Sequence, residues 1–352
     1  MTSLTVIHFY ASHSSNTATV IRSHEWYKVS PPFKPSMRLP HFLIAYAKSP
    51  LTSTSLQISL LRSSRLTLRS IHPTRAFTMS VPKSASKLVP EDAAKVMVIR
   101  DVVPNTITTL SVPFLRAGIM KIGGRGTLVR LRTGSVAVFS PAALTPEVKS
   151  KIQAMGTLKY IIAPDFEHHI FVSQYNKEYP QAEVIGVEGL PEKREGSSDT
   201  KGVPFQHVFT PKNKLDMHIS SEFDDEFSYE YVHAHANKEL VFLHRPTKTV
   251  IEADLLFNLP ATEQYSKSGM DAQSGILTRF FASIMNTKGD MIWQKRFLWY
   301  ALGRDHVALS ESAKRMMKWD FDRIIPCHGD VIETGGKGVM AKALQWYLEP
   351  KH

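Results

Sequence analysis

The fold of this chain is decided by the stretch His235-Ala-Asn-Lys-Glu-Leu-Val-Phe-Leu-His-Arg-Pro-Thr-Lys-Thr-Val-Ile-Glu-Ala-Asp254. Two runs of strand-forming residues, 239–244 and 249–254, flank the turn-forming Arg-Pro-Thr-Lys. The pattern predicts a β-hairpin that follows His235 and ends at Asp254. Because a buried carboxylate without a partner is costly, we expect Asp254 either to bind a metal or to cap nearby backbone.

Two other segments also place metal-binding side chains directly after a strand-forming run. They read Ile-Ile-Ala-Pro-Asp165-Phe-Glu-His168-His169 and Ile-Ile-Pro326-Cys-His328-Gly-Asp330. Imidazoles and carboxylates bind zinc and similar ions at about 2.0–2.2 Å, and rigid strand ends can aim them into a shared cleft. The three strand ends therefore predict an open α/β metal site.

The rest of the domain reads as strands alternating with helices. Thr145-Pro-Glu has the composition of a helix start, the glycines at 123–126 indicate a turn, and residues 189–203 read as a loop. Residues 261–318 read as three helices inserted before the last strand, at 321–326. Their aromatic residues are interpreted as packing against the sheet or as lining a substrate lid: Phe280, Phe281, Trp293, Phe297 and Trp299.

Nearly all of the net charge of +11 belongs to the N-terminal arm. Residues 1–90 contain 11 Lys or Arg and one acidic residue, Glu25, whereas the remaining residues are nearly neutral. The high isoelectric point is therefore no argument for a nucleic-acid partner. The Arg-, Ser- and Leu-rich arm is typical of a mitochondrial presequence, and the alternative is a cytoplasmic product translated from Met79.

The sequence divides into a basic targeting or disordered arm, 1–90, and a single domain, 91–352, that contains the 261–318 insertion. The single cysteine, Cys327, excludes an intramolecular disulfide and is expected to be buried and inert. No apolar run reaches the length of a transmembrane segment. The sequence does not indicate an oligomeric state.

The three segments together resemble the metallo-β-lactamase superfamily. Residues 235–254 are similar to its third and fourth motifs, in which a histidine enters a hairpin ending in Gly-Asp; Ala253 stands here in place of the glycine. Residues 326–330 are similar to the fifth motif, Pro-Gly-His-Gly, with Cys327 in place of the first glycine. The resemblance implies an α/β fold, the αββα sandwich, and points to a divergent branch without an assigned function.

The second motif of that superfamily, His-x-His-x-Asp-His, is eroded in this chain. The corresponding residues are Pro164-Asp-Phe166-Glu-His168-His169, so both histidines of the first metal are replaced, His168 stands at the aspartate position and only His169 is retained from the motif. The resemblance then implies one zinc or iron ion, or no tightly held metal. The candidate metal ligands are His168, His169, His235, Asp254 and His328, with His233 as a competing assignment for His235.

Asp165 is the nearest spare carboxylate. It is a candidate catalytic residue, as the general base to a metal-bound water, and it could equally orient His168 or His169. Two functions follow from the pattern. The first is a mononuclear metal-dependent hydrolase of a small-molecule ester, thioester or lactone. The second is a catalytically inactive ligand-binding or interaction module that retains the fold.

Overall fold

The computed structural model describes residues 92–349. The predicted N-terminal arm, with its targeting and start-codon hypotheses, lies outside the described residues. Within them no helix is both long and apolar enough to cross a bilayer.

The larger of the two main sheets has seven strands that follow the chain order. Its first four strands are antiparallel and its last four parallel, with the fourth strand belonging to both sets. The strands are β1 (Val98–Val103), β2 (Ile107–Val112), β5 (Gly124–Arg130), β6 (Ser135–Phe139), β7 (Thr157–Ile162), β8 (Glu183–Val187) and β9 (His207–Phe209).

The second sheet contains the hairpin predicted from residues 235–254. β10 (Phe227–Val232), β11 (Glu239–His244) and β12 (Thr249–Ile251) are antiparallel, and β13 (Arg323–Ile325) pairs with β12 in parallel. The turn between β11 and β12 is a short 3-10 helix, Arg245–Thr247. β12 ends at Ile251, so Asp254, which was expected to end this strand, lies beyond it.

The two sheets pack face to face, and aromatic rings fill part of the space between them. The ring of Phe139 in the first sheet lies 5.4 Å from that of Phe227 and 5.0 Å from that of Phe242 in the second. All three side chains are buried. Such inter-sheet contacts form the centre of a sandwich whose outer faces must be covered by other elements.

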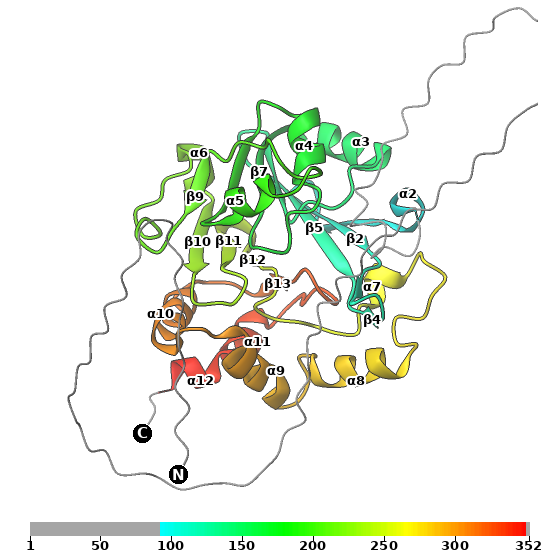
Figure 1. The fold of residues 1–352 in the computed structure, drawn as a ribbon, viewed down its shortest axis with the longest axis vertical. Helices are drawn as coiled ribbons and strands as arrows, with labels where there is room; N and C mark the ends of the chain where they lie inside the picture. The colour runs from blue at the N-terminus through cyan, green and yellow to red at the C-terminus, as the bar shows by residue number, and fades with distance from the viewer. Residues whose placement is uncertain (1–91, 350–352) are drawn as a thin grey trace, which may run out of the picture. The chain divides into compact units, whose positions relative to one another are not determined.

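Helices cover both outer faces, as Figure 1 shows. The first sheet is covered by α3 (Pro146–Met155), α4 (Val172–Glu178) and α5 (Leu190–Glu195). The second is covered by α10 (His306–Met316), α11 (Gly336–Ala343) and α12 (Gln345–Leu348). Short helices α2 (Ala93–Val96) and α6 (Ser221–Asp224) complete this part of the chain. The predicted αββα layer order is therefore the observed one.

The predicted helical insertion lies between β12 and β13. It contains α7 (Thr262–Tyr265), α8 (Ile276–Ile284), α9 (Ile292–Phe297), a π-helical turn (Leu298–Leu302) and α10. A small hairpin, β3 (Leu115–Arg116) and β4 (Met120–Lys121), packs against α8. Phe281 and Phe297 are partly buried against this unit, whereas Phe280 and Trp293 are exposed, so the packing interpretation holds for only some of the aromatic residues.

Two local predictions were wrong. Residues 124–126 belong to β5 rather than to a turn; Gly126 is required there because an added Cβ would lie 2.9 Å from the backbone nitrogen of Ala142. Residues 189–203, expected to be a loop, contain α5. That helix starts after Gly189, whose φ of +81° is accessible to glycine, and it buries Leu190 and Arg194.

Candidate metal centre

The centre is built where β7, β12 and β13 end. β12 and β13 are parallel neighbours with Ile251 opposite Ile325. Asp254 follows Ile251 by three residues along the chain, and His328 follows Ile325 by three. Parallel register therefore brings both side chains to the same edge of the second sheet. His168 follows β7 of the first sheet and reaches the same point from the other side.

The three donor groups converge on one point. Nε2 of His168 lies 3.2 Å from Nε2 of His328, which lies 3.2 Å from Oδ1 of Asp254. One donor atom from each residue lies within 4.8 Å of the other two. Around a tetrahedral zinc ion with bonds of about 2.05 Å, donor atoms are separated by roughly 3.3 Å. Two of the three spacings therefore match those around a small divalent cation.

Outer hydrogen bonds turn both imidazoles so that Nε2 faces this point. Nδ1 of His328 donates to the backbone oxygen of Gly123 at 2.7 Å, and Nδ1 of His168 lies 2.9 Å from Oδ2 of Asp165. A metal-binding histidine ordinarily has such a partner on its other nitrogen, which fixes the tautomer and the ring orientation. The two rings thus have the arrangement that ligation by Nε2 requires.

Asp165 is fully buried and its contacts describe a positioning role. Its Oδ1 accepts hydrogen bonds from the backbone N–H groups of Glu167 and His168, both at 2.8 Å. The same carboxylate faces the His168 ring. Of the two roles left open by the sequence, orientation of His168 is the one that these contacts support, because both oxygens already have partners.

Asp254 is held by two residues that the sequence analysis did not single out. The buried carboxylate of Glu239 accepts from the backbone N–H groups of Ala253 and Asp254, at 2.8 and 3.0 Å. Asn237 donates from Nδ2 to Oδ2 of Asp254 at 2.6 Å, which leaves Oδ1 facing His328. The sequence offered one signal for Glu239, because it is the charged residue at the start of the otherwise apolar run Glu-Leu-Val-Phe-Leu.

The loop carrying His328 is fixed from the first sheet. The buried side chain of Arg125 donates from Nη1 to the backbone oxygens of Pro326 and Gly329, both at 2.6 Å. Gln264 bonds the backbone of Cys327 and Gly329. Gly329 has a φ of +91°, and a Cβ there would lie 2.1 Å from the oxygen of Asn258, so only glycine fits.

Electrostatics make the centre attractive to a cation. Burial lowers the pKa of His168, but the negative charges of Asp165, Asp254 and Glu239 outweigh it and raise that pKa to about 10. Burial raises the pKa of Asp254, but the His168 and His328 imidazoles outweigh it and hold that pKa well below its ordinary value. Burial beside the other two carboxylates raises the pKa of Glu239 to about 8. Metal binding would displace the His168 proton.

Two of the five predicted ligands lie outside the converging group. His169 is turned away: its Nδ1 lies 3.0 Å from the Arg194 guanidinium, and burial with the charges of Lys193 and Arg194 lowers its pKa to about 4. His235 is buried, with Nδ1 accepting from the backbone N–H of Asn237 and Nε2 without a hydrogen-bond partner. His233 likewise lies outside the group.

Aromatic side chains form a wall beside His328. The Phe257 ring stacks on the His328 imidazole with centroids 5.2 Å apart and an interplanar angle of 14°, and Phe114 lies 6.1 Å away. Phe281 of α8 and Phe297 of α9 contact Phe257. The insertion thus contributes to the apolar side of the centre.

Cys327 is buried as expected, and its thiol lies 3.1 Å from Oγ of Ser140.

We expect the Asp165→Asn variant to bind zinc about 10–100-fold more weakly than the wild type. The amide retains an acceptor for the two backbone N–H groups but loses the charge that orients and polarises His168. Competition with a chromophoric chelator measures the affinity. The matched Asp199→Asn change in an exposed segment should have no effect, and equal affinities for both variants would contradict the positioning role.

Comparisons with known proteins give one family match and a set of structural neighbours. A family model described as a domain of unknown function (DUF4336) matches residues 117–267. The search of curated proteins gave no match. Several solved structures are similar in fold, among them three metallo-β-lactamases.

The metallo-β-lactamase from Pontibacter korlensis is 11% identical, with a TM-score of 0.45, over 72% of this chain and 100% of that chain. The enzyme from Hirschia baltica is also 11% identical, with a TM-score of 0.44, over 73% and 100%. FIM-1 from Pseudomonas aeruginosa, solved in its mono-zinc form, is 10% identical, with a TM-score of 0.44, over 72% and 97%.

Proposed function

We propose that this protein is a mononuclear metal-dependent hydrolase of an ester, thioester or lactone. The observation that carries the proposal is the convergence of His168, Asp254 and His328, with both imidazoles turned inward by outer hydrogen bonds. Two histidines and one carboxylate suit zinc or iron(II) and leave coordination positions open.

The ion would supply Lewis-acid polarisation of a carbonyl group and a hydrolytic nucleophile at neutral pH. The protein's own residues have separate tasks. Asp165 and the Gly123 carbonyl orient the two histidines, while Glu239 and Asn237 fix the carboxylate of Asp254. Fixing the ligands in advance lowers the cost of organising the site when substrate binds.

The aromatic wall favours a substrate with an apolar portion. Phe257 and Phe114 lie beside His328 on the side that the insertion covers. Rings at this position can pack against an acyl or lactone chain and exclude water from it, as apolar linings do in small-molecule sites. This wall supports an acyl-type substrate over a highly charged one.

A ligand-binding module without catalysis is the second candidate, and one observation favours it. The polar groups of the centre partner one another: Asp165 bonds His168, and His328 faces Asp254. A buried network satisfied in this way can persist without an ion. The two candidates therefore differ in whether metal is needed for a chemical reaction.

The deciding experiment is an assay of the full chain against a panel of aryl esters, acyl thioesters and lactones. The chain is stripped with a chelator and reconstituted with zinc or iron(II). We expect hydrolysis of at least one class that disappears on chelation and returns with the ion. The Asp254→Ala variant should be inactive, whereas the control His207→Asn, in the edge strand β9, should retain the activity.

Turnover that survives chelation and the Asp254→Ala change would contradict the mechanism. Stoichiometric ligand binding without turnover, in a chain loaded with metal, would favour the binding module.

A further inference from the structure

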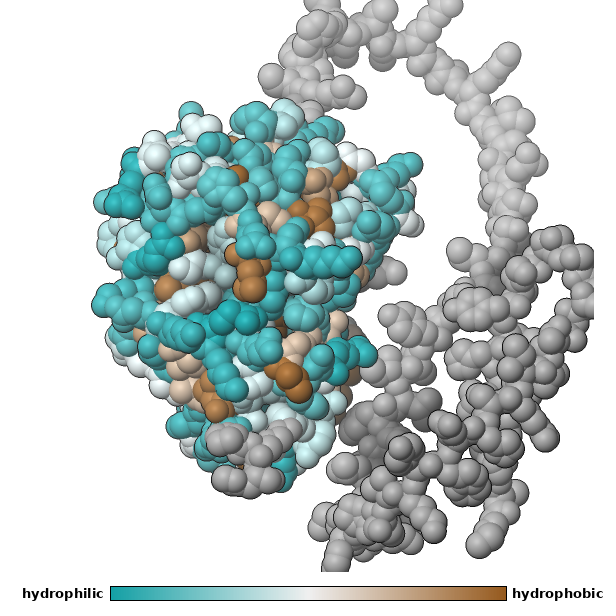
Figure 2. Space-filling view, turned by 90° about the vertical axis from the view of Figure 1, so that its left-hand side faces the viewer, coloured by the Kyte–Doolittle hydropathy of each residue, from teal (hydrophilic) through white to brown (hydrophobic). Residues whose placement is uncertain are grey.

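The exposed apolar side chains of the described residues are concentrated on the helical insertion. Of the eight large apolar side chains that are exposed, six belong to residues 261–318. They are Ile276, Leu277, Phe280, Trp293, Tyr300 and Val307. By contrast, the face that carries β9 and α6 is predominantly polar, with apolar residues in small scattered spots (Figure 2). Contiguous exposed apolar groups mark interaction sites more often than scattered ones do.

Helix α8 presents its apolar residues outward. Its buried residues are Thr278 and Ala282, whereas Ile276, Leu277 and Phe280 are 78%, 52% and 62% exposed. Phe280 lies four residues after Ile276 and three after Leu277, so its side chain is next to both of them on the helix surface. The helix also packs Phe281 and Ile284 against the domain, yet it directs three large apolar side chains outward, where they are available to bind something else.

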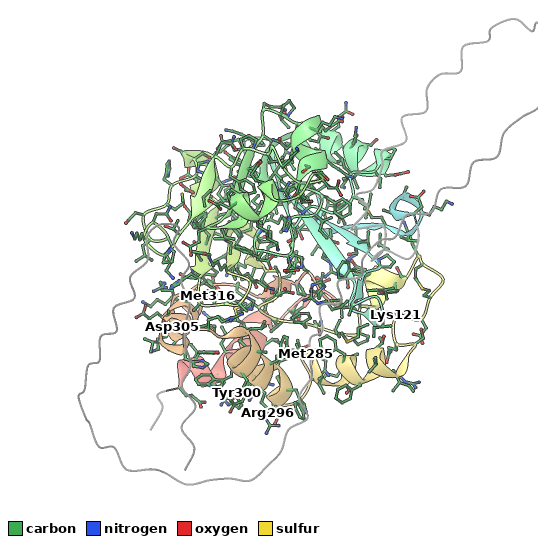
Figure 3. The ribbon with its side chains drawn as sticks, viewed as in Figure 1. Lys121, Met285, Arg296, Tyr300, Asp305 and Met316 are labelled. Atoms are coloured by element: carbon green, nitrogen blue, oxygen red, sulfur yellow. The ribbon has the colours of Figure 1, made fainter. Side chains whose placement is uncertain are left out.

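The β3–β4 hairpin extends this strip. Thr278 donates from Oγ1 to the backbone oxygen of Ile119 and accepts from the N–H of Lys121, at 3.4 and 3.2 Å. Ile119 itself is 59% exposed. On the other side, α8 and α9 meet at Phe257, and Figure 3 shows Arg296 on the outer side of α9 and Tyr300 on the π-helical turn that follows it. Ile119, α8 and the outer side of α9 will be called the α8–α9 face.

The charges around this face are mostly positive. Residues 274–300 contain four basic residues and one acidic residue, Asp290. Arg279, Lys288 and Arg296 are exposed, and the Arg296 guanidinium lies 5.0 Å from the Trp293 ring. Tryptophan, tyrosine and arginine beside large aliphatic residues are the composition of surfaces that lie in the headgroup region of a bilayer.

We propose that the α8–α9 face docks on the surface of an anionic lipid bilayer, with Ile276, Leu277 and Phe280 entering the headgroup–acyl boundary and the basic residues contacting lipid phosphates. Charge complementarity selects this occupant. A second copy would bring the same basic residues into contact, and the N-terminal arm, with 11 basic residues and one acidic, is also positively charged. This inference does not depend on the proposed hydrolysis.

A fluorophore at the face tests the proposal in the full-length chain. The Phe280→Cys variant is labelled with an environment-sensitive dye; Cys327 is buried, and burial raises the pKa of its thiol, so it should not react. The control carries the dye at Leu215→Cys, an exposed apolar position between β9 and α6. Both are mixed with vesicles of phosphatidylcholine and phosphatidylserine, and with phosphatidylcholine alone.

We expect a blue shift and an intensity increase at position 280 with the anionic vesicles, and neither change at position 215. Adding Ile276→Ser and Leu277→Ser to the labelled variant should weaken partitioning about ten-fold. Equal responses at 280 and 215 would mean that the basic arm alone binds the vesicles, and the proposal would be wrong. A blue shift at 280 that grows with protein concentration without lipid would identify a second copy instead and overturn it.

Discussion

The Asp254→Ala variant is expected to lose its metal almost completely, with an affinity for zinc at least about a thousand-fold below that of the wild type. Loss of an outer partner of a ligand already costs about 10–100-fold, and Asp254 is the only carboxylate in the converging group. Its removal leaves two imidazoles, one of which sits among carboxylates that favour its protonated form. Proton and metal then compete for His168 without the charge that favoured the metal.

Elemental mass spectrometry of purified protein gives the metal content, and chelator competition gives the affinity. The wild type should contain about one ion per chain. The His328→Ala variant should behave as Asp254→Ala does, while His207→Asn should match the wild type. Retention of a full equivalent of metal by Asp254→Ala would show that the ion is held elsewhere.

The Arg125→Met variant should lower the free energy of unfolding by about 3–5 kcal/mol. The Arg125 guanidinium is buried and donates to Ser111 and to the carbonyls of Pro326 and Gly329, and its Nη2 lies 3.5 Å from Glu263. Methionine fills a similar volume but leaves these carbonyls without their cationic partner, and Glu263 keeps only its ion pair with Arg100. Because the carbonyls belong to the His328 loop, metal affinity should fall together with stability.

Denaturant unfolding of both proteins measures the change in stability. The matched control is Arg130→Met in the same strand, β5, because the Arg130 side chain is exposed and makes one hydrogen bond, to the oxygen of Met155. That control should cost less than about 1 kcal/mol. Equal losses of unfolding free energy for the two variants would contradict the view that Arg125 stabilises the loop carrying His328.

The sequence predicted the layer order and several elements because their signals are local. The helix of residues 146–155 begins after Thr145, whose side chain accepts from the N–H of Val148, as its position before proline and glutamate indicated. The hairpin turn at 245–248 follows from Arg-Pro-Thr-Lys in the same way. Such features depend on residues within one turn of each other, so they can be recognised without the rest of the fold.

The details of the centre depend on contacts that the sequence does not encode locally. His168 and His169 are adjacent and chemically identical; only the positions of Arg194 and Asp165 decide which ring faces Asp254. The resemblance favoured His169 as the retained ligand, and the structure instead brings His168 to the group. The positions of Glu239 and Arg125 as supports likewise require knowledge of which distant loops they contact.

The three converging residues come from loops far apart in sequence, and the entire helical insertion separates Asp254 from His328. Contacts between residues so distant in sequence form late in folding, because a long stretch of chain must be ordered first. A ribosome would have to release nearly all of the domain before His328 could meet the other two groups. Because the group does not exist before the domain has formed, we expect an ion to bind a chain that is already folded.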